Sequence, residues 1–214
     1  MSDSSLRAAY SVWALGYDAF LGSTTSGARR RSVELLAPRA GERILLVGVG
    51  TGLDLPHLPR HAAYHAVDLT PAMLRRARGR AARLGLPVAL AEASASALPF
   101  EDEGFDAIIL HLILAVVPDP AAALREVARI LRPGGRAVIW DKMLREGRRP
   151  SLVRRAVHAL THRHVTGFLF DLGAALEAAP ALRVTHREPS LFGGMWQIVR
   201  LEKTEDRRRR TEDR

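Results

Sequence analysis

An apolar run that ends in a glycine-rich loop is the feature that most narrows the fold of this chain. Residues Arg43–Gly48 have the composition of a buried strand, and the loop Val47–Gly52 follows without a break. Glycines there permit a tight turn and let a ligand approach the backbone closely. Asp68 ends the next strand-like run, 20 residues after Gly48. A carboxylate at that point can accept hydrogen bonds from both ribose hydroxyls of an adenosine, so the pattern predicts an adenosine site.

Strand-like and helix-like runs alternate along the chain, which favours βαβ units and a parallel sheet. The length of 214 residues suits a single domain. We expect strands at Arg43–Gly48, Tyr64–Asp68, Pro87–Ala91, Phe105–His111, Arg136–Asp141, Leu182–Glu188 and Met195–Glu202. We expect helices at Arg29–Leu36, after Thr70-Pro71, after Asp119-Pro120, at Pro150–Arg163 and at Leu172–Ala178. The fold class is therefore α/β.

Two of these helices carry clear end signals. Thr70 and Asp119 are N-cap residues, and each is followed by proline at the first helical position. Arg80 belongs to a set of arginines that we place on the solvent face of the helix after Thr70-Pro71. Gly134-Gly135 is expected to end the second helix and to turn the chain into the following strand.

The two ends of the chain differ from its middle. Apolar and aromatic side chains recur at helical spacing near the start, at Leu6, Tyr10, Trp13, Tyr17 and Phe20. We therefore divide the chain into an N-terminal helical cap at 1–38 and a main domain at 39–202. The charged segment 203–214 has no apolar residue and is expected to be a disordered tail.

Composition narrows the chemistry. The chain has no cysteine, which excludes disulfides, thiolate metal sites and cysteine nucleophiles. Its net charge of +9 comes almost entirely from arginine, which we attribute to compositional bias more than to an anionic macromolecular partner. His158, His162 and His164 have no acidic partner nearby, so we expect no metal site. The start lacks a signal-peptide pattern and the longest apolar stretch, Ala107–Val117, is too short to span a bilayer, so a cytoplasmic location is expected.

The glycine loop also indicates which class of adenosine-containing ligand the site binds. A dinucleotide fingerprint requires a small residue at position 53, where this chain has Leu53, and Gly52 comes one position early. The sequence contains no Gly-x-x-x-x-Gly-Lys-Ser/Thr motif. Both observations disfavour NAD and P-loop chemistry.

Several stretches resemble, in order, segments of one enzyme family. They are Val47–Gly52, Ala66–Leu74, Ala97–Phe100, Gly104–Asp106, Leu124–Val127 and Leu131–Gly135. On these segments the chain resembles class I S-adenosylmethionine (SAM)-dependent methyltransferases, in the branch of ubiquinone/menaquinone C-methyltransferases and bacterial phospholipid N-methyltransferases. The segments Tyr10–Asp18 and Val117–Pro120 are most similar to the phospholipid enzymes.

The resemblance implies a Rossmann-like sheet of seven strands, mostly parallel with the last strand antiparallel, and helices on both faces. It implies SAM as the cofactor and assigns roles to matching positions. The implied cofactor-binding residues are Val47, Gly48, Gly50, Thr51, Gly52, Asp68, Leu69, Met73, Ser94, Ala95 and His111. The implied substrate-pocket residues are Tyr10, Tyr17 and Asp141.

Three positions leave alternatives open. His111 ends a strand beside the glycine loop, where it either lines the pocket as a catalytic base or is a hydrogen-bonded, partly buried histidine. Leu46 and Ser94 stand where the family usually carries acids. Their lack of charge either weakens cofactor binding or is compensated from elsewhere.

The implied reaction is an in-line displacement at the sulfonium methyl, for which the protein mainly positions the nucleophile and excludes water. The first candidate acceptor is a small molecule or a lipid headgroup amine such as phosphatidylethanolamine, reached through peripheral contact with an anionic membrane. The second is a quinone precursor or other soluble molecule methylated on carbon or oxygen. A basic nucleic-acid-binding protein with a vestigial cofactor site is the third hypothesis, disfavoured because the enzyme-like sheet uses nearly the whole chain.

Overall fold

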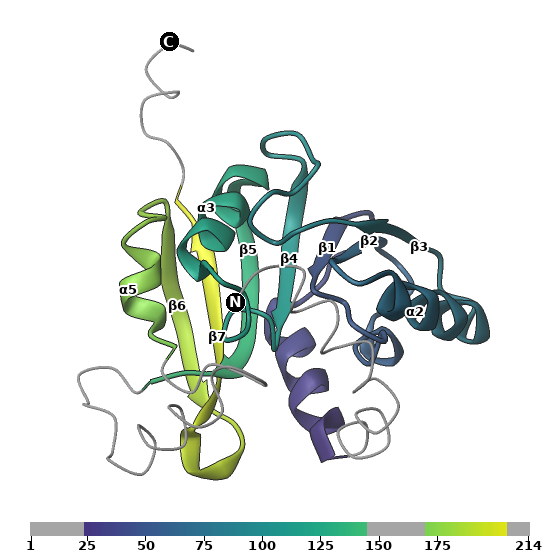
Figure 1. Cartoon of the computed structure of the whole chain (residues 1–214), viewed down its shortest axis with the longest axis horizontal. Coiled ribbons are helices and arrows are strands. Elements are labelled where there is room, and N and C mark those ends of the chain that lie inside the picture. Colours follow the sequence, from purple (N-terminus) through teal and green to yellow (C-terminus); the bar gives the residue numbers. More distant parts are fainter. Residues whose placement is uncertain (1–23, 145–169, 205–214) are drawn as a thin grey trace.

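The computed structural model describes residues 24–144 and 170–204, which form one twisted sheet covered by helices (Figure 1). Seven strands have the order β3-β2-β1-β4-β5-β7-β6. Their bounds are β1 Arg43–Val47, β2 Ala63–Asp68, β3 Val88–Glu92, β4 Phe105–His111, β5 Leu131–Lys142, β6 Leu182–Pro189 and β7 Trp196–Lys203. The pairs among β1 to β5 are parallel, and β7 is antiparallel to both β5 and β6. The predicted seven-stranded, mostly parallel fold is confirmed.

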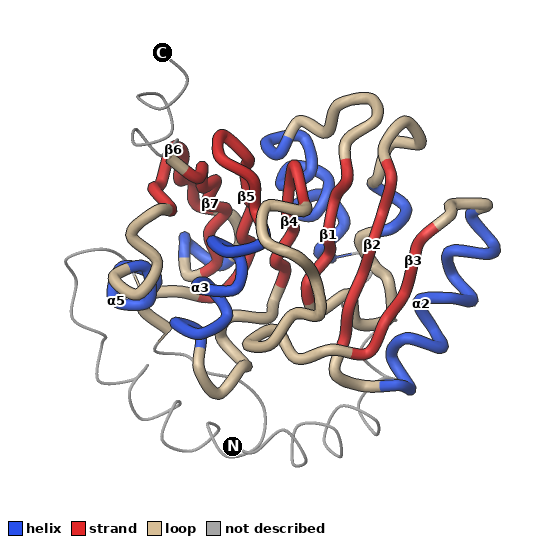
Figure 2. The backbone as a smooth tube through the Cα atoms, turned by 90° about the horizontal axis from the view of Figure 1, so that it is seen from above, coloured by secondary structure: helices blue, strands red, loops and turns tan. Residues whose placement is uncertain are grey.

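Helices cover both faces of the sheet. They are a helix over 24–36, α2 at Pro71–Leu84, α3 at Pro120–Ile130 and α5 at Leu172–Leu176, with short 3-10 turns η1 at Leu55–His57 and η2 at Phe192–Gly194. The apolar sides of α3 and α5 join one buried cluster, and those of helix 24–36 and α2 join the other. Figure 2 shows α2 beside β3 at one edge of the sheet, and α5 near α3 on the other side of the molecule. No helix of the described part is long and apolar enough to cross a membrane.

The helix start signals are confirmed. The Asp119 side chain accepts a hydrogen bond from the Ala122 amide at 2.9 Å, and Pro120 occupies the first turn of α3. Thr70 is the N-cap of α2 and is followed by Pro71 in the first turn, although the Thr70 side chain makes no capping hydrogen bond. Proline fits these positions because its missing N–H would have had no partner within the helix.

The prediction that Gly134-Gly135 ends α3 was wrong. The helix ends at Ile130, and Leu131 is already extended and paired with Phe105 of β4. The register then shifts, so that Arg136 is the next β5 residue opposite β4. The glycines therefore lie in an irregular start of β5 rather than in a helix-to-strand turn.

Helix 24–36 is fastened to the sheet at its C-terminal end. The Arg136 guanidinium from β5 donates to the carbonyls of Leu36 and Ala37 and pairs with Glu42 at 2.8 Å. Only 4% of the Arg136 side chain and 7% of the Glu42 side chain are exposed. The hydrogen bond from Arg136 lowers the pKa of Glu42. The helix end, which has unpaired carbonyls, thus receives donors from a central strand.

The C-terminal boundary differs by one residue from the expected start of the tail. Lys203 is the last residue of β7, and its ammonium donates to the Leu131 carbonyl at 2.7 Å. The Thr204 amide donates to Ala181. Residues beyond 204, the N-terminal helix at 1–23 and the helix expected at Pro150–Arg163 lie outside the described residues.

Candidate active site

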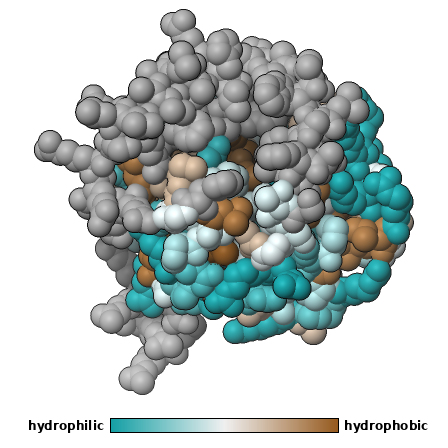
Figure 3. Space-filling model, turned by 90° about the horizontal axis from the view of Figure 1, so that it is seen from below, coloured by the Kyte–Doolittle hydropathy of each residue, from teal (hydrophilic) through white to brown (hydrophobic). Residues whose placement is uncertain are grey.

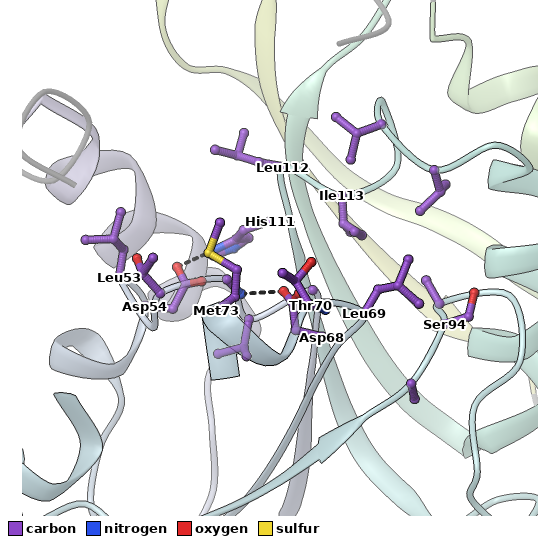
Figure 4. A pocket seen from close by; sticks show the side chains of 18 of the residues that line it. Leu53, Asp54, Asp68, Leu69, Thr70, Met73, Ser94, His111, Leu112 and Ile113 are labelled. Atoms are coloured by element: carbon purple, nitrogen blue, oxygen red, sulfur yellow. Dashed lines mark hydrogen bonds and ion pairs between the residues drawn. The ribbon is translucent and has the colours of Figure 1, made fainter. Parts of the chain in front are cut away.

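An open cavity lies at the carboxyl ends of the parallel strands β1, β2 and β4 (Figure 4). This is the edge where open α/β sheets bind ligands. Nine of the eleven predicted cofactor residues line it: Gly48, Gly50, Thr51, Asp68, Leu69, Met73, Ser94, Ala95 and His111. The remaining two, Val47 and Gly52, lie behind this wall. Residues that we had not predicted also line it, namely Arg29, Val49, Leu53, Asp54, Thr70, Ala93, Leu112, Ile113, Val116, Val117 and Pro118.

Two glycines of the loop are required for different structural reasons. Gly50 has a φ of +55°, and a Cβ atom built on it meets no atom within 4 Å, so its backbone faces open space in the cavity. Gly52 has a φ of +81°, and a Cβ there would lie 3.2 Å from the Ala77 Cα of α2. Gly50 therefore leaves room for a ligand, while Gly52 allows the loop to pack against α2.

Asp68 presents a fixed carboxylate to the cavity. Its Oδ2 accepts a hydrogen bond from the Gly50 amide at 2.8 Å, and its Oδ1 accepts one from the Thr70 amide at 2.9 Å. Burial raises the pKa of Asp68, and the hydrogen bonds from these two amides and from the Thr70 side chain oppose the rise. A carboxylate has about four acceptor sites, so these hydrogen bonds leave acceptor capacity for a ligand.

A buried polar network closes the other side of the cavity. His111 Nδ1 lies 2.7 Å from Asp54 Oδ1, and His111 Nε2 lies 2.8 Å from the Ser32 hydroxyl. Arg29 donates to the same Asp54 oxygen at 2.7 Å. Burial opposes ionisation of Asp54, but the charge of Arg29 and the hydrogen bonds from Arg29 and His111 outweigh it and hold the pKa of this carboxyl well below its usual range. Asp54 is therefore ionised, and His111 Nδ1 carries a proton that it donates to Asp54.

Comparison with known proteins identifies the fold and its chemistry. A family profile described as a methyltransferase domain matches residues 45–139. A phosphatidylethanolamine N-methyltransferase of Cereibacter sphaeroides is 34% identical over 197 residues, covering 91% of this chain and 95% of that protein. The chain belongs to the SAM-dependent methyltransferases. A demethylmenaquinone methyltransferase of Thermus thermophilus is 42% identical to this methyltransferase over 117 residues, 53% of each protein.

The fold of this methyltransferase is also shared with solved structures. A Haloferax volcanii methyltransferase, solved in complex with a methyltransferase activator, superposes with a TM-score of 0.74. The match covers 92% of this chain and 98% of that one at 17% sequence identity, so it bears on the fold alone. Among the described residues of this methyltransferase, no group of three or more His, Asp or Glu side chains is placed to hold a metal ion.

His111 lines the cavity of this methyltransferase, but both of its ring nitrogens have side-chain partners. A catalytic base needs a nitrogen within hydrogen-bond reach of the substrate. The geometry favours the alternative of a hydrogen-bonded, buried histidine, and the catalytic role stays a prediction. Ser32 and Asp54, which hold this histidine, and Arg29, which pairs with Asp54, were missed in the sequence because nothing local marks them.

Asp141 of this methyltransferase is not among the residues that line the cavity. It is 1% exposed, and its carboxylate accepts hydrogen bonds from the amides of Ala115 and Lys142 at 3.0 and 2.7 Å. The loop after β4, residues 112–118, supplies much of the apolar cavity wall. Asp141 thus supports that wall from behind. The other predicted substrate residues, Tyr10 and Tyr17, lie outside the described residues.

Asp141 gives a pH-dependent stability that Asp141→Asn should remove. Burial raises the pKa of Asp141 from 3.8 to about 6. A raised pKa means that the folded state binds the proton more tightly, so this group's contribution to the free energy of unfolding falls as pH rises through that interval. We expect the wild type to lose about 1–3 kcal/mol relative to D141N between pH 4 and pH 6. Urea unfolding of both proteins across this range measures it, and parallel pH profiles would contradict it.

Proposed function

We propose that the cavity binds SAM and that this methyltransferase transfers the methyl group to the headgroup amine of phosphatidylethanolamine. The observation that carries the first half is the Asp68 carboxylate, fixed by the amides of Gly50 and Thr70 beside the glycine loop. When bound, the cofactor would supply a methyl group activated by the sulfonium. The chain would supply binding, orientation and exclusion of water.

The residues present fit the adenosine part of SAM. Asp68 has acceptor capacity left for the ribose hydroxyls. Leu69, Met73 and Ala95 line the cavity as apolar residues suited to the adenine, and Ser94 offers a hydroxyl. These are the roles that we expected from the sequence.

The phosphatidylethanolamine acceptor is supported by similarity along nearly the whole chain to an enzyme named for that reaction. A second candidate, C-methylation of a quinone, is supported by the shorter match to a demethylmenaquinone methyltransferase. Residues Ile113, Val116, Val117 and Pro118 form an apolar wall that suits the non-headgroup part of either acceptor.

A labelled-methyl transfer assay separates the two candidates. We expect label from SAM to enter the lipid fraction when vesicles contain phosphatidylethanolamine, and not when they contain only phosphatidylcholine, which has no methyl-accepting amine. A demethylated quinone and a phenolic acceptor, offered in detergent micelles, should stay unlabelled. Label in the quinone and none in the lipid would overturn the proposed acceptor and leave the methyltransferase assignment intact.

Access to a lipid headgroup requires contact with a membrane surface. The net charge of +9 would draw the protein to anionic vesicles, and we propose peripheral association from the cytoplasmic side. Sedimentation with phosphatidylethanolamine–phosphatidylglycerol vesicles should pull down the protein at low salt and less of it as salt rises. An equal amount pelleting with neutral phosphatidylcholine vesicles would contradict the electrostatic origin. A nucleic-acid partner remains the disfavoured alternative.

A further inference from the structure

Asp54 brings to the cavity wall a carboxylate that the sequence did not lead us to expect there. The family usually carries an acid just before the glycine loop, but here Leu46 lies there and is 1% exposed in the apolar core. The nearby loop after Gly52 instead brings the Asp54 carboxylate into the cavity wall. We propose that Asp54 binds the positively charged amino group at the methionine end of SAM, with Arg29 facing its carboxylate. This inference rests on the proposed cofactor site.

The hydrogen bonds of Asp54 leave one of its oxygens available. Arg29 Nη1 and His111 Nδ1 both end on Oδ1. Among the described residues, no hydrogen bond ends on Oδ2. An ionised carboxylate oxygen in a confined wall is a strong acceptor for an ammonium group, because charge-assisted hydrogen bonds strengthen where water is excluded.

Arg29 complements this acceptor. Its Nε donates to the Thr25 hydroxyl at 3.2 Å and its Nη1 donates to Asp54. Within the part of the chain that the structure describes, no hydrogen bond uses Nη2, and Arg29 lines the cavity. A guanidinium and a carboxylate side by side match the carboxylate and ammonium of an amino acid, which is itself a pair of opposite charges.

The order of groups along the cavity fits the shape of the cofactor. Figure 4 shows Asp54 and His111 on one side of Asp68, and Leu69 and Ser94 on the other. A ribose held by Asp68 would place its adenine toward Leu69 and Ser94. The chain attached to the opposite end of the ribose would then run past the glycine loop toward Asp54.

Calorimetric titration with two product-like ligands tests the assignment. S-adenosylhomocysteine has the amino-acid end, whereas 5′-methylthioadenosine keeps the adenosine and lacks that end. For Asp54→Asn we expect affinity for S-adenosylhomocysteine to fall about ten- to a hundredfold, and affinity for methylthioadenosine to change less than about twofold. Glu188→Gln is the matched control. Glu188 of β6 pairs with Arg31, which lies in the same helix as Arg29, and Glu188 does not line the cavity. It should leave both affinities unchanged.

A second variant tests the same proposal if D54N does not fold. D54N leaves Arg29 as a buried, unpaired charge, which destabilises proteins strongly, whereas replacing both partners is often neutral. The double variant Arg29→Met/Asp54→Asn should therefore fold and show the same selective loss of S-adenosylhomocysteine binding. Unchanged affinity, or an equal loss for both ligands, in the variants that fold would overturn the role of Asp54. Wild type that binds neither ligand would overturn the proposed cofactor site itself.

Discussion

Asp68→Ala should reduce SAM affinity about a hundredfold or more while the protein stays folded. The variant removes the acceptors for both ribose hydroxyls, and each hydrogen bond to a charged group contributes about 1.5–3 kcal/mol. It also frees the amides of Gly50 and Thr70, so the loop loses the group that holds it in place. Calorimetry and initial rates of methyl transfer measure the two effects.

Asp102→Asn is the matched control for this experiment. Asp102 pairs with Arg129, 74% of its side chain is exposed, and it is not among the residues that line the cavity. It removes the same charge without touching the site. If D68A bound SAM as tightly as D102N does, the ribose role of Asp68 would be wrong and the cofactor would have to lie elsewhere.

The second large effect concerns stability. Glu42→Gln should lower the free energy of unfolding by about 3–5 kcal/mol, because it leaves the buried Arg136 guanidinium without its counter-charge. The pair lies at 2.8 Å, and Arg136 also supplies the donors at the end of helix 24–36. Urea unfolding followed by circular dichroism measures the change.

The double variant Glu42→Gln/Arg136→Met distinguishes the effect of the unpaired Arg136 charge from the effect of losing the Arg136 hydrogen bonds. Removing both charges should recover most of the lost stability, because replacing a buried ion pair by apolar groups is often neutral. Some loss should remain, since the helix carbonyls of Leu36 and Ala37 lose their donors. A double variant no more stable than E42Q would show that losing the capping bonds costs as much as leaving the Arg136 charge unpaired.

Local patterns were sufficient for the sheet and for the ribose end of the site. An apolar strand, three glycines and an acid at the next strand end are short-range features, and Gly48, Gly50 and Asp68 line the cavity as expected. The network around His111 could not be found in the same way. Its contacts join residues that are 25, 57 and 79 positions apart, so only the folded arrangement of helix 24–36, η1 and β4 shows them.

Other differences have equally physical causes. Asp141 ends a strand of the cavity-bearing sheet, as expected, but its side chain points to amides of the loop after β4. The position of Asp141 in its strand therefore predicted which part of the fold it lies in, but not where its side chain points. Arg80, assigned to the solvent face of its helix, donates to the Thr51 carbonyl at 2.8 Å, because its long side chain reaches back to the glycine loop.

The attachment of helix 24–36 bears on how this protein can be shortened. The helix is joined to β5 through Arg136, to β6 through the ion pair of Arg31 with Glu188, and to the cavity through Arg29 and Ser32. A chain that began at residue 39 would keep all seven strands and the glycine loop. It would still uncover Trp140, over which Arg29 lies, and would leave Asp54 without Arg29 and His111 without Ser32. The smallest cooperative folding unit is therefore larger than the sheet domain that the sequence delimits.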